Sequence, residues 1–230
     1  MLWANIQRLI KKGDQIMKMT MRTVLLGMSV MSISALADDS TSTNQMMTSI
    51  SSQDFVTEAV WAGEKEVEMG QMALGKSQDA SVTNFAARMV RDHTRANERL
   101  IRIADQESLS YPATNSFAPE NWAGLNTDDF KGMQAAALMQ NNTGTNADLK
   151  MAKYLDSLSG ASFDQAYAAC AVQDHTNAVE LFSGASQTLQ DKQLKRFATR
   201  VLPTLKDHYQ MAVDMQNEVS TNAPAAPMSR

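Results

Sequence analysis

The chain is poor in cysteine, with a single one, Cys170, among 230 residues. One cysteine cannot form an internal disulfide, even in an oxidising compartment. Cys170 lies in the apolar run YAACAV. A cysteine in such a setting is expected to be a small buried packing residue and not a reactive thiol.

Positive charge is also scarce in the part of the chain that we expect to fold. Beyond residue 37 there are 16 Lys and Arg against 24 Asp and Glu, a formal net charge of −8. A protein that binds nucleic acid needs the opposite balance, because its main partner is the phosphate backbone. We therefore expect no nucleic-acid partner.

No apolar run reaches the roughly twenty residues that a transmembrane helix needs. The run TVLLGMSVMSISALA follows Lys18 and Arg22 and ends in Ala-Leu-Ala at residue 37. This order is typical of a secretory signal peptide spanning residues 1–37, with cleavage after Ala37. Residues 1–16 precede the basic region, which leaves Met17, Met19 and Met21 as alternative starts of translation. The mature chain is expected in the periplasm or outside the cell, or peripheral to the outer membrane, with no transmembrane span.

Strand-like alternation of polar and apolar residues is almost absent, and helical periodicity takes its place. Apolar residues recur at steps of three and four in four long segments, which predict helices over 52–77, 79–107, 162–189 and 191–219. These segments predict one domain over residues 52–219, between a disordered linker, 38–51, and a disordered tail, 220–230.

The two halves of this domain repeat one another at an offset of 112 residues. FAAR at 85–88 returns as FATR at 197–200, and Asp79 returns as Asp191. Each half predicts a helical hairpin in which the aspartate caps the second helix. Two hairpins joined by a long crossover, 108–161, predict an all-α, ferritin-like four-helix bundle. Part of the crossover, around 146–158, predicts a short helix of its own.

Several motifs resemble a known bacterial envelope family, the domain of unknown function 4142 (DUF4142). They are AGEKEVEMGQMAL, FAARMVRDHTRANERL, LSGASFDQAY, QDHTNAVELF and FATRVLPTLKDH, in that order between about residues 52 and 219. The resemblance implies a ferritin-like fold and a place in the outer membrane or periplasm. It implies no established reaction. Residues 122–146 look like an insertion relative to the family.

All three histidines of the chain, His93, His175 and His208, follow an aspartate and occupy core positions of predicted helices. They lie some fourteen to seventeen residues from the nearest predicted hairpin turn, which places the three rings at similar heights. Glu66 is the inward polar residue of the first helix at that height. One polar side chain from each helix would form a cluster of three imidazoles and a carboxylate, which suits zinc, iron, copper or nickel.

Five further acidic residues are candidates for supporting such a cluster by hydrogen bonds to the ligands. They are Asp92, Asp174, Asp207, Glu68 and Glu180. The ligand pattern of ferritin is missing, since Val90, Val172 and Leu205 stand three residues before the histidines where that pattern has glutamate. No serine or cysteine is placed against a histidine as a nucleophile would be, so no catalytic residue is assigned.

These patterns favour an exported binding or stress-related protein that holds a metal ion in a buried Glu/His cluster. A metal-free structural or interaction module is the alternative, in which the same cluster is a hydrogen-bonded core that fixes helix register. A metal-dependent oxidoreductase is a weaker third reading. The expected partners are a metal ion and another envelope protein, and the expected state is a monomer or weak oligomer.

Overall fold

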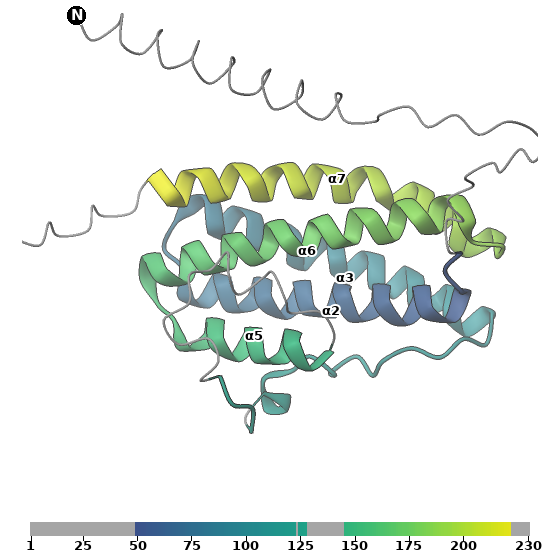
Figure 1. Ribbon diagram of the computed structural model, residues 1–230, viewed down its shortest axis with the longest axis horizontal. Coiled ribbons are helices and arrows are strands. Elements are labelled where there is room, and N and C mark those ends of the chain that lie inside the picture. Colours follow the sequence, from purple (N-terminus) through teal and green to yellow (C-terminus); the bar gives the residue numbers. More distant parts are fainter. Residues whose placement is uncertain (1–48, 123, 128–144, 222–230) are drawn as a thin grey trace, which may run out of the picture. The chain divides into compact units, whose positions relative to one another are not determined.

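The computed structural model describes residues 49–122, 124–127 and 145–221. Within these residues the protein has five α-helices, one short 3-10 helix and no strand (Figure 1). The predicted all-α class is confirmed. The predicted signal peptide, most of the linker and nearly all of the tail lie outside the described residues. None of the described helices is long and apolar enough to cross a membrane.

The helices follow the predicted spans to within two residues at each end. The elements in chain order are α2 (Ser52–Lys76), α3 (Ala80–Gln106), η1 (Pro119–Asn121), α5 (Thr145–Ser157), α6 (Gly160–Thr188) and α7 (Lys192–Thr221). The short helix predicted near residues 146–158 is α5. The last helix, α7, continues through Pro203 without a break in its assignment.

Side-chain caps explain where three of the four long helices, α2, α3 and α7, begin. Ser51 Oγ accepts a hydrogen bond from the backbone N–H of Asp54 at 3.0 Å. Asp79 Oδ1 accepts from the N–H of Ser81 at 2.8 Å, and Asp191 Oδ1 accepts from the N–H of Leu194 at 2.7 Å. Each oxygen satisfies a donor that has no partner inside the helix. The two predicted aspartate caps are thereby confirmed.

The four long helices pack as two hairpins, α2 with α3 and α6 with α7. The hairpins meet through α3 against α7 and through α2 against α6, and α5 packs against α2 and α6 (Figure 1). Every long helix therefore packs against two others, and all four turn an apolar face inward. Residues on these faces position the candidate site described below.

The core consists of two apolar clusters rather than one. The first cluster includes Phe85, Phe163 and Met215, and the second includes Phe182 and Phe197. Along each long helix, the residues of one cluster are followed by the residues of the other. The change from one cluster to the other falls near the middle of each helix, where buried polar side chains interrupt the apolar stripe.

Gly70 brings α2 close to α3 and generates a test of this packing. A Cβ at Gly70 would lie 2.8 Å from a methyl group of Val90 and 3.1 Å from the carbonyl oxygen of Ala86, whereas a Cβ at Gly75 would meet nothing within 4 Å. We expect Gly70→Ala to lower the free energy of unfolding by about 1–3 kcal/mol, because the helices must separate. The matched change Gly75→Ala should raise it by about 0.5–1 kcal/mol. Urea denaturation measures both, and equal effects would contradict the close approach.

Candidate metal centre

A band of buried polar side chains crosses the molecule between the two apolar clusters. Its members are 8 % exposed or less and come from all four long helices: Lys65 and Glu66 from α2, His93 from α3, His175 from α6 and His208 from α7. Burying so many polar groups is costly unless each finds a partner. The hydrogen bonds of these side chains therefore show which polar atoms are satisfied within the protein and which remain available to a ligand.

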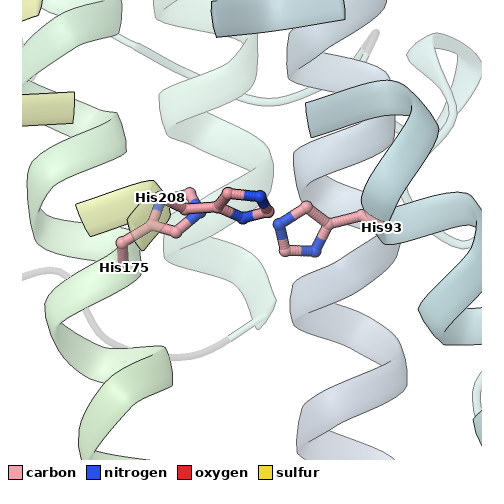
Figure 2. A group of neighbouring side chains, drawn as sticks. All are labelled: His93, His175 and His208. Atoms are coloured by element: carbon pink, nitrogen blue, oxygen red, sulfur yellow. The ribbon is translucent and has the colours of Figure 1, made fainter. Parts of the chain in front are cut away.

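The three histidines converge at the centre of the band. One ring nitrogen from each of His93, His175 and His208 lies within 4.8 Å of the other two. The ring centroids are separated by 5.4–5.6 Å. Figure 2 shows the three rings reaching from α3, α6 and α7 into the space between the helices. The heights estimated from the turns thus place these residues together, as the sequence predicts.

Hydrogen bonds on the outer side fix the tautomers of two of the rings. His175 Nδ1 lies 2.9 Å from the carbonyl oxygen of Ala171, so this nitrogen carries the proton and donates it. His208 Nε2 lies 3.1 Å from a carboxylate oxygen of Asp92 and donates likewise. The opposite nitrogen of each neutral ring then carries a lone pair.

The inner ring nitrogens have no hydrogen-bond partner. They are His93 Nε2, His175 Nε2 and His208 Nδ1, each buried and unpaired among the described residues. Native proteins leave few buried polar atoms unsatisfied, so three in one cluster indicate a missing partner. An imidazole that donates one N–H outward and aims the other nitrogen inward has the arrangement of a metal ligand.

All three imidazoles are neutral at physiological pH. Burial lowers the pKa of His93 well below its usual value, and the nearby His175 and His208 lower it further. Burial likewise lowers the pKa of His175, to about 4. The pKa of His208 is lowered by burial although its hydrogen bond to Asp92 opposes the shift. The lone pairs are consequently available without competition from protons.

Asp92 supports His208 as a charged carboxylate. Burial alone would raise the pKa of Asp92, but hydrogen bonds from His208 and Arg91 lower it overall. Its oxygens also lie 3.2 Å from Arg88 Nε and 3.0 Å from Arg91 Nε. Asp92 precedes His93 in the sequence, yet it bonds the histidine of a different helix.

Glu66 lies in the band but outside the histidine group. Among the described residues, the group of possible ligands within 4.8 Å of one another contains the three histidines alone. Glu66 instead hydrogen-bonds to Asp174, and burial together with the charge of Asp174 raises its pKa to about 8. The raised pKa favours the protonated carboxyl group, which can donate to Asp174, while Oε1 of Glu66 is buried without a partner.

Lys65 completes the band and was not predicted from the sequence. Its Nζ lies 2.7 Å from Asp174 Oδ1 and 2.9 Å from Asp148 Oδ1. Burial alone would lower the pKa of Lys65, but the charges of the two aspartates raise it above its ordinary value. Trp61 Nε1–H also donates to Asp148, at 2.9 Å, so this aspartate fastens α5 to α2. In the charged run GEKEVE, nothing in the sequence distinguishes Lys65 from a surface lysine.

No hydrogen bond joins the other three predicted supporting residues to a histidine in the described part of the chain, although the charge of Asp207 acts to raise the pKa of His208. Asp207 and Glu180 are exposed. Glu68 is partly buried, and burial and the charge of Glu120 raise its pKa. Only Asp92 and Asp174 of the five predicted acidic residues therefore belong to the band or its hydrogen bonds.

Comparison with known proteins gives the family of this chain. The family model for the domain of unknown function DUF4142 matches residues 37–215. The chain belongs to this family. No curated protein matches the chain. A crystal structure of a DUF305 protein from Streptomyces coelicolor, assigned as secreted, is similar to this DUF4142 chain with a TM-score of 0.53 and 18 % identity, over 72 % of this chain and 91 % of that one. This likeness supports the fold and carries no residue roles.

The chemistry open to this DUF4142 protein follows from its donor set. Three neutral imidazole nitrogens suit zinc, copper, nickel or iron. In zinc enzymes, three protein ligands leave a fourth position free for another molecule, whereas structural sites fill all four. The buried cluster therefore offers a metal three nitrogen ligands and leaves a fourth coordination position for another molecule.

The low pKa values of the histidines can be measured directly. The metal-free protein should give three imidazole titrations by NMR, all with midpoints below 6.5, and that of His175 should lie at about 4, because burial disfavours the charged ring. The unfolded chain protonates near pH 6.5, so the contribution of these histidines to stability falls as the pH drops below that value.

The change His175→Gln assigns its resonance, and circular dichroism at each pH confirms that the helices persist. A midpoint at or above 6.5 for any of the three rings would mean that burial does not hold that ring neutral, and would contradict the buried neutral cluster.

Proposed function

We propose that this protein is an exported, ferritin-like four-helix bundle that binds one transition-metal ion on His93, His175 and His208. The observation that carries the proposal is a group of three buried histidines whose possible ligand atoms lie within 4.8 Å of one another, each with a buried ring nitrogen that has no partner. A metal ion would satisfy all three at once. A hydrogen-bonded core, the alternative function, would instead pair these nitrogens with donors, and none of the described residues supplies one.

The spacing of the nitrogens fits such an ion after a small adjustment. Ligands of a tetrahedral zinc ion stand about 2.0–2.1 Å from the metal and hence about 3.3 Å from one another. Because the possible ligand atoms lie within 4.8 Å of one another, shifts of the rings by roughly an ångström would bring the nitrogens to this distance. The outer hydrogen bonds of His175 and His208 already hold two rings in the correct tautomer.

Export is the second part of the proposal. It rests on the basic and apolar order of residues 18–37, which is typical of a signal peptide, and on the family match, which begins at residue 37. The assignment of the similar Streptomyces coelicolor protein as secreted agrees with it. A periplasmic or extracellular protein with a buried histidine site could sequester or carry metal ions in the cell envelope.

Metal analysis of single-site variants tests the binding proposal. Purified protein loaded with zinc and then desalted should retain about one ion per chain. Each of the changes His93→Ala, His175→Ala and His208→Ala should abolish this stoichiometric binding, because two remaining nitrogens hold an ion poorly. Circular dichroism checks that each variant is folded. Retention of zinc by all three folded variants, or no zinc in the parent protein, would contradict the site.

Two aspartates form a matched pair for the same assay. Asp92 bonds His208, whereas Asp207 precedes His208 in the sequence but is exposed. Asp92→Ala should weaken zinc affinity by about 10–100-fold, since the ring loses its orienting partner. Asp207→Ala should leave the affinity unchanged. Equal effects of the two changes would mean that the Asp92–His208 hydrogen bond does not support a ligand.

Mass spectrometry of the exported protein tests the signal peptide. Cleavage after Ala37 should produce a mature chain that begins at Asp38. Replacement of Ala37 by a bulky residue should cause the precursor to accumulate, because the processing enzyme requires small residues before the cut. An exported chain that retains residues 17–37 would contradict the cleavage.

A further inference from the structure

The histidine cluster borders a large cavity inside the molecule. This cavity has a volume of about 780 Å³ and is lined by residues of α2, α3, α5, α6 and α7. Protein interiors are otherwise packed as closely as organic crystals. A volume of this size is typical of sites for small organic ligands, which span roughly 300–1,000 Å³.

One end of the cavity is polar and offers acceptors. His93, His175, His208 and Glu66 line it, and each carries a buried atom without a hydrogen-bond partner among the described residues. All four side chains are more than nine-tenths buried. The unpartnered atoms therefore face a buried space that a bound molecule can fill.

The other end of the cavity is apolar. Its lining includes Leu100 from α3, Phe182 from α6, and Phe197 and Leu205 from α7, all of which are buried members of the second apolar cluster. These residues present only hydrocarbon to a ligand. A molecule in the cavity would thus meet metal-binding nitrogens at one end and apolar side chains at the other.

The cavity reaches solvent between α2 and α6. Thr57 and Glu58 on α2 and Asn177 on α6 belong to its lining and are exposed. These two helices pack side by side (Figure 1). A small molecule can therefore enter by this route without separation of the hairpins.

The charges around the cavity disfavour an anionic ligand. Lys65 is already bound to two aspartates, Asp148 and Asp174, so it offers no unpaired positive charge. Glu58 adds an acidic group at the entrance. A divalent metal on three neutral imidazoles would add two positive charges, and these carboxylates together with Asp92 already offset them, so the metal does not require an anionic ligand.

We propose that the cavity binds an uncharged, mainly apolar organic molecule whose single nitrogen or oxygen donor occupies the open coordination position of the histidine-bound metal. The body of this ligand lies among Leu100, Phe182 and Phe197. The inference rests on the proposed metal function, because the metal supplies the anchor. It extends that function from holding an ion to recognising a metal-bound organic ligand.

Cobalt-substituted protein provides the test, because the visible absorption of Co²⁺ reports both the histidine ligands and any added donor. The protein is first titrated with Co²⁺, and then with imidazole or 1-hexylimidazole, which share one donor and differ in their apolar tail. We expect 1-hexylimidazole to bind about tenfold more tightly or better, because its tail is transferred from water to the apolar end.

A pair of variants locates the tail. Ala178 lines the cavity and Ala161 is exposed on the same helix. Ala178→Phe should reduce the preference for 1-hexylimidazole to about threefold or less while Co²⁺ still binds, because the added ring takes up space where the tail would lie. Ala161→Phe should leave the preference unchanged. An Ala178→Phe protein that binds Co²⁺ and keeps the full preference would overturn the assignment of this cavity.

The two proposals fail in different ways. Co²⁺ binding without any preference for the hexyl compound over imidazole would overturn the ligand inference and leave the metal site intact. This comparison uses the unmodified chain, so it stands even where Ala178→Phe does not fold. Absence of Co²⁺ binding to the histidines would overturn the metal proposal and the ligand inference together.

Discussion

The rest of the structure depends on how one layer of buried polar groups is satisfied. All four long helices carry polar side chains midway along an otherwise apolar stripe, and packing the helices brings these side chains to one level. A buried polar atom without a partner costs about 1–3 kcal/mol, so the layer must be resolved internally or by a ligand. Lys65 is satisfied within the protein by ion pairs with Asp148 and Asp174. His175 and His208 are satisfied only on their outer sides, and the inner nitrogens of all three histidines remain available.

The ion pairs of Lys65 connect α5, which belongs to the crossover, to the layer of polar groups that contains the histidines. The lysine requires Asp148, which is supplied by α5 and not by any of the four long helices. Docking of α5 therefore adds a second carboxylate to the one that Asp174 of α6 already presents to Lys65. The same lysine lowers the pKa of His175, after burial and His208. The crossover thus completes the ion pairs of Lys65, while burial is the main cause that holds His175 neutral, the state that binds a metal.

Much of the fold could be predicted because the relevant signals are local. The periodicity of apolar residues and the capping of helix N-termini both depend on residues close together in the sequence. The helix ends and the capping roles of Asp79 and Asp191 could therefore be predicted. The convergence of the histidines could also be estimated, since position along a helix fixes height to within a turn. Partners across helices could not be predicted: the hydrogen bond between Glu66 and Asp174 joins two helices, and Lys65 resembles any solvated lysine until α5 is placed beside it.

The central claim is that one metal ion lies among the three histidines. A crystal of the zinc-loaded protein, measured at the zinc absorption edge, tests it by locating the metal directly. The account predicts a single strong anomalous peak about 2.0–2.1 Å from His93 Nε2, His175 Nε2 and His208 Nδ1. Peaks confined to surface carboxylates, with ordered water or a protein donor bonded to the three inner nitrogens, would contradict it.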